Sequence, residues 1–342
     1  MDSDAARGPG MATSQLPRVI LGTWPTPVEP APSLAAAVGL GPEDLWVKRD
    51  DLIGLGGGGN KVRKLEWTIG AALAEGADTV VTTGAPQSNH ARLTAAAAAR
   101  SGLEAVLVFP GAPGASRSGN LALDGLFGAR IAWAGDVGGN GLAAAAARVA
   151  QRLTGEGRHV AVIPFGGSSS VAALGYAECG RELLHQVPDL RTVVVAVGSG
   201  GTMAGLVAAL GPDRVLGVDT GAIPDPLPVV ASFASGAGAA AVTPVQLTVR
   251  RDQVGGGYGD YPAAADAALR LAARTEGLVL DPVYTARAMA GLAAAVRDGQ
   301  LVPGQKTVFV HTGGLPGLFG HAAAIERAER GLAQYTGDTP LS

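Results

Sequence analysis

The sequence predicts an α/β protein built on parallel β-sheets, and three observations support this fold class. Short runs rich in Val and Thr alternate along the chain with Ala-rich stretches of helical length. Hydrophobic residues make up 47% of the chain and aromatic residues only 4%, so the core must be packed from Ala, Val and Leu. At roughly 150 residues per domain, the 342 residues predict two domains with room for an enclosed site between them.

The predicted strands are continuous apolar runs, and each ends in glycine or in a polar turn. Such strands are typical of a parallel sheet covered by helices on both faces, with ligands bound at the carboxyl ends of the strands. The Gly-rich loops lie at those ends. The runs are TVVTTG at 79–84, EAVLVFPG at 104–111, HVAVIPFGG at 159–167, TVVVAVGSGG at 192–201, RVLGVDTG at 214–221 and TVFVHTGG at 307–314.

Charge and composition exclude several classes of protein. The net charge is -3 and no basic patch is present, which argues against nucleic-acid binding. No apolar stretch is long enough to span a membrane and no signal peptide is recognisable, so we expect a cytoplasmic protein without a membrane partner. The single cysteine, Cys179, excludes an internal disulfide framework and is expected to be a buried helix thiol, and no ligand spacing suggests a metal. We expect a disordered N-terminus, with translation starting at Met1 or Met11.

The first candidate site is the loop GGGGNKVRK, in which Gly56–Gly59 precede Asn60 and Lys61. The residues that follow have a helical pattern, so Lys61 is expected at a helix N-terminus. The positive end of the helix dipole, together with Arg63 and Lys64, should favour the neutral, nucleophilic amine that Schiff-base chemistry requires. A solvated or phosphate-binding lysine is the alternative, although the Walker pattern GxxxxGK[ST] is absent.

A second candidate is the polar turn after the strand at 79–84. The segment GAPQSNHARL places Ser88, Asn89 and His90 just before a predicted helix. The amides and the hydroxyl there could bind a carboxylate. Ser and Asn are also preferred helix caps, so a purely structural role is an equal alternative, and His90 could be a surface histidine.

The strongest anion-binding signal is a glycine-rich turn between a buried strand and a helix. Backbone N–H groups and the helix dipole converge there on one anion, most naturally a phosphate. A dinucleotide is the rival ligand, because Asp219 lies about 20 residues further on. However, Met203 occupies the third glycine position of the GxGxxG pattern. The turn consists of Gly198, Ser199, Gly200, Gly201 and Thr202.

Three C-terminal segments place polar or phenolic groups beside turns. They are GGGYGDYP, LDPVYTARAMAGL and TVFVHTGGLPG, and their candidate residues are Tyr258, Tyr284 and Thr312. The chain has only 5 tyrosines, so two in short loops flanked by Gly and Pro indicate a functional role. Packing against a neighbour is an equally good explanation for each ring taken alone.

Nine segments, taken in order, resemble the family of 1-aminocyclopropane-1-carboxylate deaminases and D-cysteine desulfhydrases, within the tryptophan-synthase-β-like class of pyridoxal-phosphate enzymes. The resemblance spans roughly residues 21–317. It implies two open, mainly parallel twisted sheets flanked by helices, with the cofactor in the cleft between domains (fold type II). The segments are LGTWPTPVEPAP, KRDD, GGNKVRKLE, GAPQSNHAR, GNLALDGLFGA, IPFGGSSSVAALGY, GSGGTMAG, LDPVYTARAMAG and HTGGLPGLFG.

The resemblance implies a cofactor site for pyridoxal 5′-phosphate. Lys61 would hold the cofactor as a Schiff base, and the turn from Gly198 to Thr202 would bind its phosphate. Asn89 would bind the phenolic oxygen of the cofactor ring. Thr312 would hydrogen-bond the pyridine nitrogen without protonating it, which makes the ring a weaker electron sink.

The resemblance also implies a substrate site for a small amino acid. Ser88 and His90 would contact the substrate beside Asn89. Tyr258 and Tyr284 would flank the reacting atoms, so they and Ser88 join Lys61 as the implied catalytic residues.

Two positions separate the branches of this family. The deaminases carry Glu directly after the DPVY tyrosine and Leu in the final loop, where this chain has Thr285, an implied substrate contact, and Thr312. A weaker electron sink favours β-elimination over opening of a cyclopropane ring. We therefore expect a pyridoxal-phosphate-dependent carbon–sulfur lyase, namely a D-cysteine desulfhydrase that releases pyruvate, hydrogen sulfide and ammonia.

Other activities share these motifs. A lyase acting on L-cysteate or D-serine, or a 1-aminocyclopropane-1-carboxylate deaminase, would use the same residues. A Rossmann-type oxidoreductase or a non-catalytic binding module would keep the phosphate loop but would not need Lys61. Val62, where the family usually has Thr, and Tyr261, at a family proline position, affect the prediction of the substrate rather than of the cofactor.

The resemblance also predicts the domain organisation. A large cofactor domain would comprise residues 1–63 plus 178–342, and a small α/β domain would be inserted at residues 64–177. A homodimer is implied as well. The Ala- and Gly-rich stretch near Ser235 is expected to be a linker or a surface loop.

Overall fold

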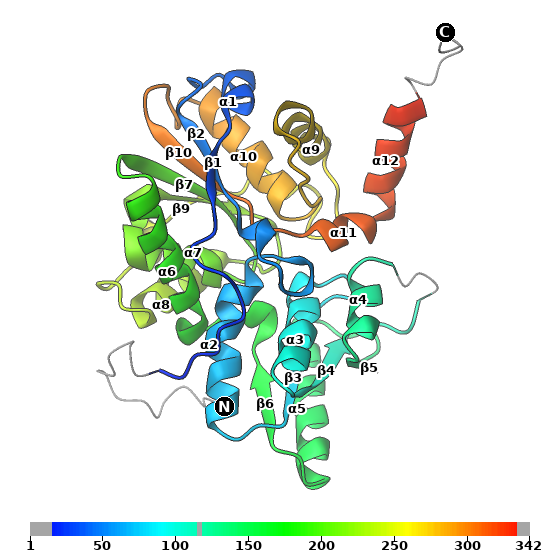
Figure 1. The fold of residues 1–342 in the computed structure, drawn as a ribbon. Coiled ribbons are helices and arrows are strands. Elements are labelled where there is room, and N and C mark those ends of the chain that lie inside the picture. The colour runs from blue at the N-terminus through cyan, green and yellow to red at the C-terminus, as the bar shows by residue number, and fades with distance from the viewer. Residues whose placement is uncertain (1–15, 115–117, 334–342) are drawn as a thin grey trace.

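The computed structural model describes residues 16–114 and 118–333 and contains two β-sheets, each flanked by helices (Figure 1). The larger sheet has six strands in the order β1-β2-β10-β7-β8-β9, and the smaller sheet has four in the order β5-β4-β3-β6. Within the sheets all neighbouring strands are parallel except β1 and β2. The predicted α/β fold with two mainly parallel sheets is confirmed.

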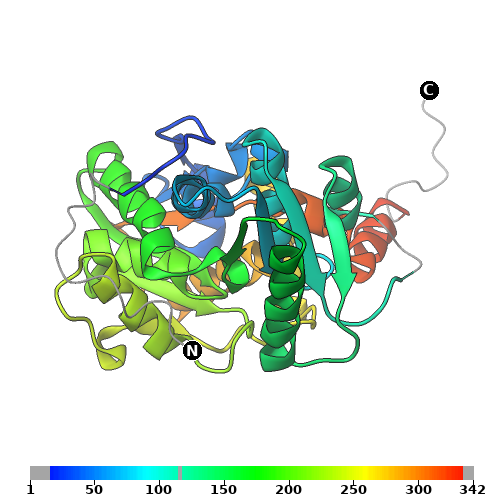
Figure 2. The ribbon, with the colours of Figure 1, turned by 90° about the horizontal axis from the view of Figure 1, so that it is seen from below.

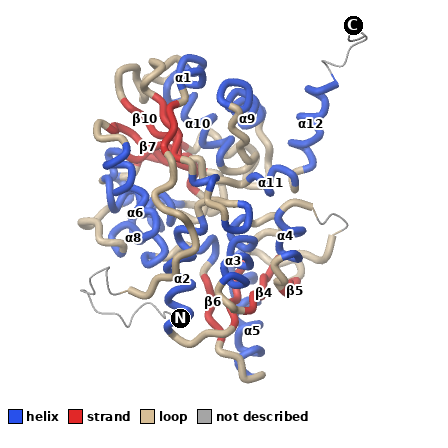
Figure 3. The backbone as a smooth tube through the Cα atoms, in the orientation of Figure 1, coloured by secondary structure: helices blue, strands red, loops and turns tan. Residues whose placement is uncertain are grey.

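Each of the six runs predicted from the sequence overlaps a strand. The larger sheet consists of β1 (Val28–Pro30), β2 (Leu45–Lys48), β7 (Leu190–Val197), β8 (Val215–Asp219), β9 (Thr248–Arg250) and β10 (Lys306–Val310). The smaller consists of β3 (Thr79–Thr83), β4 (Glu104–Phe109), β5 (Arg130–Trp133) and β6 (Val160–Ile163). Figure 3 shows the strands as two separate groups. All four strands of the smaller sheet lie within residues 64–177, the range expected for the inserted domain, whose exact limits remain a prediction.

The helices surround both sheets, as the view from below in Figure 2 also shows. In β7, Val194 and Ala196 pack towards α9 and α10, while Val193 and Val195 pack towards α6 and α7, so this strand is buried on both faces. The helices are α1 (Pro32–Val38), α2 (Lys61–Ala74), α3 (Asn89–Arg100), α4 (Asn120–Leu126), α5 (Gly139–Gly155), α6 (Ser170–Gln186), α7 (Gly201–Leu210), α8 (Pro226–Gly236), α9 (Ala263–Glu276), α10 (Thr285–Arg297), α11 (Leu315–Phe319) and α12 (Ala322–Ala333).

Small residues allow the helices to pack closely. A Cβ added to Gly205 of α7 would lie only 2.1 Å from the carbonyl oxygen of Ala173 in α6, so only glycine fits at this contact. The buried residues of α3 include four consecutive alanines. Close contact between backbones therefore takes the place of large aromatic side chains in the core, as the composition predicts.

Three smaller expectations have different outcomes. Cys179 is a buried free thiol in α6, as expected, and burial raises its pKa to about 12. The stretch near Ser235 was expected to be a linker or loop, and this is wrong for the part up to Gly236, which ends α8, a helix that begins with Pro226 after the capping side chain of Asp225. The Ala and Gly residues at 237–241 that follow do form a turn and a loop. The expected disordered N-terminus, with its two possible start positions, lies outside the described residues. In the part of the chain that the structure describes, no helix is long and apolar enough to cross a membrane.

Candidate active site

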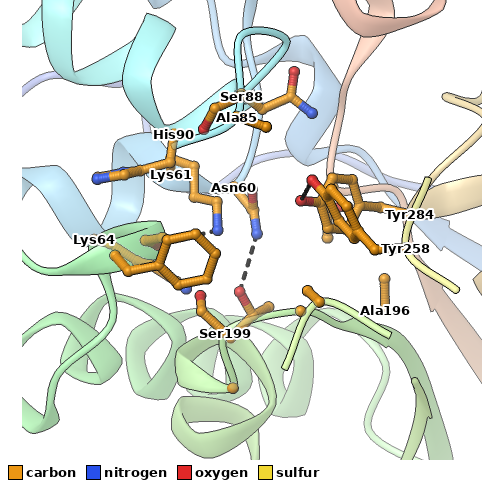
Figure 4. A pocket seen from close by; sticks show the side chains of 18 of the residues that line it. Asn60, Lys61, Lys64, Ala85, Ser88, His90, Ala196, Ser199, Tyr258 and Tyr284 are labelled. Atoms are coloured by element: carbon orange, nitrogen blue, oxygen red, sulfur yellow. Dashed lines mark hydrogen bonds between the residues drawn. The ribbon is translucent and has the colours of Figure 1, made fainter. Parts of the chain in front are cut away.

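A cavity of about 340 Å³ lies between the two sheets, where the loops after β3, β7 and β10 converge. In Figure 4, Lys61 lies on one side of this cavity and a pair of tyrosines on the other. The volume is at the lower end of the range for small-molecule sites, about 300 to 1,000 Å³. Among the residues predicted from the sequence, those that line the cavity are Lys61, Ser88, Asn89, His90, Gly198, Ser199, Gly200, Thr202, Tyr258, Tyr284 and Thr312.

Lys61 is the first residue of α2, and its amine reaches the cavity. Nζ donates a hydrogen bond to the carbonyl oxygen of Gly166 at 3.1 Å. Burial lowers the pKa of Lys61 to about 8, although a hydrogen bond with Lys64 acts in the opposite direction. The preceding loop, Gly56–Gly59, has positive φ at all four positions, which only glycine adopts readily. The sequence at this loop therefore delivers an amine that is easily deprotonated.

Lys64, one turn further along α2, is also buried against the cavity. Its Nζ donates to Oγ of Ser168 at 3.0 Å, and that hydroxyl lies 2.7 Å from Oγ of Ser199. Burial, and secondarily the charge of Lys61, lower the pKa of Lys64 well below its usual value. We call Lys61, Lys64, Ser168 and Ser199 the lysine floor. Two buried lysines side by side, with hydroxyl groups as neighbours, make this floor a natural site for an anion.

Arg63 does not contribute to the floor, contrary to the sequence-based expectation. Its guanidinium is buried on the opposite face of α2, where Nε donates to Asp50 and Nη2 to Glu182, both at 2.8 Å. The low pKa of Lys61 is therefore caused mainly by burial and not by Arg63.

The glycine-rich turn after β7 lies beside the floor at the N-terminus of α7. Gly200 has a φ of 87°, which allows the chain to turn sharply from strand to helix. Gly201 does not line the cavity, and its N–H donates to Oγ of Ser168 at 3.3 Å. Thr202 accepts a hydrogen bond from Asn60 at 3.0 Å, which connects this turn to the loop that carries Lys61.

The Ser88 turn has both of the roles considered from the sequence. Ser88 caps α3 by accepting a hydrogen bond from the N–H of Ala91 at 3.2 Å, and it also lines the cavity. His90 is buried, and its Nε2 lies 2.8 Å from the hydroxyl of Thr82, which itself donates to the carbonyl oxygen of Ile163. Nε2 must therefore be the donor, and burial lowers the pKa of His90 well below its usual value. The ring is a neutral wall of the cavity.

Two phenols form the opposite side of the cavity. The hydroxyl groups of Tyr258 and Tyr284 lie 2.6 Å apart (Figure 4). Burial raises the pKa of both, and for Tyr284 well above its usual value. Each phenol therefore keeps its proton at neutral pH.

Asp281 is a buried residue of this wall that the sequence analysis missed. Its carboxylate accepts hydrogen bonds from three backbone N–H groups, those of Val283, Tyr284 and Thr285. Burial raises its pKa, and these hydrogen bonds oppose the rise. We call Tyr258, Tyr284, Asp281 and Thr285 the tyrosine wall. Asp281 fixes the start of α10 and thereby the position of Tyr284.

Thr285 differs from the expectation that it contacts the substrate. It is fully buried, and its hydroxyl donates to Asp281 at 2.7 Å. It does not line the cavity. The structure therefore places Thr285 behind the wall, where it supports Asp281. Thr312, by contrast, lines the cavity, and its carbonyl oxygen accepts from the N–H of Asn60 at 3.0 Å.

Comparison with known proteins adds to this geometry. Residues 19–313 match the family model described as pyridoxal-phosphate dependent enzyme. The chain belongs to this family. The dinucleotide alternative finds no support, since Asp219, the acid it requires, accepts a hydrogen bond from the N–H of Gly221 and does not line the cavity.

Several members of the family resemble the chain over most of its length. It is 39% identical to a protein of Pyrococcus horikoshii named "Putative 1-aminocyclopropane-1-carboxylate deaminase" over 90% of this chain and 94% of the relative. It is 38% identical to the D-cysteine desulfhydrase of Salmonella typhi over 90% and 97%. Among solved structures, an ACC deaminase homologue superposes with a TM-score of 0.84 and 36% identity over 92% and 97%. A maize serine racemase, with a TM-score of 0.60 and 20% identity over 91% of this chain and 93% of its own, shares the fold.

The residues of the cavity fit the cofactor of this family, pyridoxal phosphate. The buried amine of Lys64 has hydrogen-bonding neighbours but no carboxylate in contact within the described residues, so a bound phosphate would supply the negative charge that favours its protonated form. The amine of Lys61, with its pKa of about 8, suits an aldehyde. Lys64 and Ser168 were not predicted as site residues. The repeated lysine of NKVRK, spaced three residues from Lys61 and so on the same helix face, was the available signal.

Proposed function

We propose that the protein is a D-cysteine desulfhydrase, which converts D-cysteine and water to pyruvate, hydrogen sulfide and ammonia by β-elimination. The observation that carries this proposal is the position of the two protonated phenols of Tyr258 and Tyr284, which lie across a small cavity from the amine of Lys61. An amine base on one side and a proton donor on the other are what an elimination between Cα and Cβ requires.

Lys61 serves in this proposal as cofactor anchor and then as general base. When bound, pyridoxal phosphate accepts the electron pair left on Cα, so that the bond from Cβ to sulfur can break. The amine of Lys61, when it is not bonded to the cofactor, could remove the α-proton of the substrate, because its pKa of about 8 lies close to neutral pH. The glycine loop and the hydrogen bond to Gly166 hold the amine in place.

The substrate carboxylate and the phenolic oxygen of the cofactor would both be bound at the start of α3. The hydroxyl of Ser88 and the backbone N–H groups of Asn89 and His90, at the N-terminus of α3, would provide donors for the substrate carboxylate. Asn89 provides an amide N–H group for the phenolic oxygen of the cofactor ring. His90 contributes shape rather than charge, because burial lowers its pKa and keeps the ring neutral.

The tyrosine pair would deliver a proton to the departing sulfur. A thiolate is a better leaving group when it is protonated as it departs, and a phenol whose pKa is raised still holds its proton at neutral pH. The two hydroxyls are hydrogen-bonded, so a proton given by one can be replaced from the other. The pair therefore acts as one donor.

The cavity favours a substrate with a small, uncharged side chain. Among the described residues that line it, Lys61 and Lys64 are the only lysine or arginine side chains, and in this proposal the cofactor uses both. A sulfonate, as in L-cysteate, would need a further cation, so this alternative is disfavoured. The volume of about 340 Å³ must also hold the cofactor, which leaves room for only a small amino acid.

The runner-up function is 1-aminocyclopropane-1-carboxylate deamination, which is the activity named for the Pyrococcus horikoshii relative. The threonine hydroxyl of Thr312 in the cavity argues against it, since a hydroxyl beside the pyridine nitrogen leaves the ring a weaker electron sink. By the same family resemblance, we propose that the enzyme is a cytoplasmic homodimer.

The test is a substrate comparison with purified protein loaded with pyridoxal phosphate. Pyruvate and sulfide would be measured with D-cysteine and L-cysteine, pyruvate with D-serine and L-cysteate, and 2-oxobutyrate with 1-aminocyclopropane-1-carboxylate. We expect the highest kcat/KM with D-cysteine. Faster formation of 2-oxobutyrate would replace the proposal by the deaminase. Turnover of L-cysteate as the best substrate would contradict the charge argument.

A further inference from the structure

Arg92 is a fully buried arginine of α3 that connects three segments behind the cavity. Its Nη1 donates to the carbonyl oxygens of Gly56 at 2.5 Å and Gly58 at 3.0 Å, in the loop that precedes Lys61. Its Nε donates to Oδ1 of Asn120, the first residue of α4, at 3.0 Å. These partners are neutral oxygens. The buried carboxylate of Asp124 favours the charged form of Arg92 and so opposes the lowering of its pKa by burial, but its oxygens accept no hydrogen bond within the described residues. The hydrogen bonds of this guanidinium therefore go to the glycine loop, to Asn120 and to Asn89.

The contact with Arg92 determines which way the side-chain amide of Asn120 faces. A guanidinium has only donors, so the atom of Asn120 that contacts it must be the oxygen. The amide nitrogen of Asn120 therefore faces the other way, where it donates to the carbonyl oxygen of Gln87 at 2.8 Å and to Oδ1 of Asn89 at 3.0 Å. The orientation of Asn120 follows from its hydrogen-bond partners alone.

The contact with Asn120 in turn determines the orientation of the side-chain amide of Asn89. Its Oδ1 accepts the hydrogen bond from Asn120 and a longer one, 3.4 Å, from Nη2 of Arg92. With the oxygen engaged twice, the amide nitrogen is the part of the side chain left for a ligand, and Asn89 lines the cavity. If Asn89 were rotated by 180° about its last side-chain bond, its nitrogen would face two donors. The network thus allows only one orientation.

We propose that Arg92 and Asn120 are positioning residues that hold the amide of Asn89 with its N–H group directed at the phenolic oxygen of pyridoxal phosphate. The inference rests on the role given to Asn89 in the proposed function, but not on the identity of the substrate. Arg92 also holds the glycine loop, so one side chain sets the relative position of Asn89 and Lys61.

The substitution N120D separates positioning from folding. The introduced carboxylate still accepts from Arg92 and gives the buried guanidinium a charged hydrogen-bond partner, but it cannot donate to Asn89 or to the carbonyl oxygen of Gln87. Asn89 would then turn its own nitrogen towards this carboxylate and present its oxygen to the cofactor. Removing Arg92 outright, as in R92M, would also release the glycine loop and could prevent folding, so N120D is the main test.

The experiment measures the dissociation constant of pyridoxal phosphate and the absorption maximum of the bound cofactor in the wild type, N89A, N120D and the double variant. N140D, at an exposed position of α5, is the control for the added charge. The melting temperature of each cofactor-free protein checks the fold. None of these measurements uses a substrate, so failure of D-cysteine turnover would leave this inference untouched.

We expect N89A and N120D each to weaken cofactor binding about tenfold or more and to shift the absorption maximum, as the loss of a hydrogen bond to a charged oxygen would. The double variant should resemble N89A alone, because N120D acts through Asn89. A folded N120D protein with wild-type affinity and absorption would overturn the proposal. So would additive effects of the two substitutions, because they would show that Asn120 acts independently of Asn89.

Discussion

Burial shifts the pKa values of the groups on the two sides of the cavity in opposite directions. In the lysine floor, burial lowers the pKa of Lys61 and of Lys64 and so favours the free amines. In the tyrosine wall, burial raises the pKa of Tyr258 and of Tyr284 and so favours the protonated phenols. Before any ligand is bound, the amines of the floor therefore lose their protons more easily than exposed lysines do, and the phenols of the wall keep theirs more firmly than exposed tyrosines do. We therefore expect the floor to respond to the cofactor and the wall to the substrate.

The largest effect should come from removing the amine of the floor. K61A should lower kcat by about 10³-fold or more, because both the covalent anchor and the base are lost. Reduction with borohydride followed by peptide mass spectrometry should find the cofactor on Lys61 in the wild type and nowhere in K61A. Cofactor attached to another lysine in the wild-type protein would show that the floor has been assigned wrongly.

The wall should affect turnover without affecting the cofactor. Y284F and Y258F should each lower kcat for D-cysteine by about 10²-fold, since general acid catalysis is worth roughly that much. The dissociation constant of pyridoxal phosphate should stay within about twofold of the wild type. Y176F is a matched control, because Tyr176 is a buried tyrosine whose hydroxyl donates to Asp50, away from the cavity. A large loss of cofactor affinity in Y284F or Y258F would contradict the proposal that the floor binds the cofactor while the wall acts on the substrate.

Lys64 tests whether the floor binds the phosphate. K64Q should weaken binding of pyridoxine 5′-phosphate, which has no aldehyde to react with Lys61, by about 10- to 100-fold. Binding of pyridoxine, which has no phosphate, should not change. K306Q is the control, since Lys306 pairs with Asp189 at the surface. Equal losses for both ligands would mean that Lys64 supports the cavity generally and does not recognise phosphate.

The lowered pKa of Lys64 also predicts how the K64Q variant should change the pH dependence of stability. The unfolded chain holds a proton on this lysine up to about pH 10.4, whereas the folded chain releases it at lower pH. The unfolded state therefore binds more protons in that window, so the stability of the cofactor-free protein should rise with pH there. K64Q should reduce this rise in thermal unfolding measured from pH 7 to pH 10.

Half of the floor, Lys61 and Ser199, and the two phenols of the wall could be predicted from the sequence. The glycines before Lys61 and after β7 allow backbone turns that other residues rarely adopt, so the places of these loops at helix N-termini follow from the local sequence pattern. The direction in which a side chain points from its helix does not follow from local pattern. Arg63 and Thr285 lie in the right segments, but each side chain turns to a buried acid, which is Asp50 for Arg63 and Asp281, four residues earlier in the chain, for Thr285. Local sequence placed the segments, and only the assembled fold decided which side chains face the cavity.

T285V should have the smallest effect on turnover, and it distinguishes the wall observed here from the one predicted by resemblance. Valine matches the shape of threonine but lacks the hydroxyl that donates to Asp281 and accepts from its N–H, both at 2.7 Å. The loss should cost about 1 to 3 kcal/mol of unfolding free energy, measured by denaturant titration. The KM for D-cysteine should change little, because Thr285 does not line the cavity. A raised KM with unchanged stability would instead place the hydroxyl on the substrate, because a supporting role behind the wall must appear in the stability of the fold.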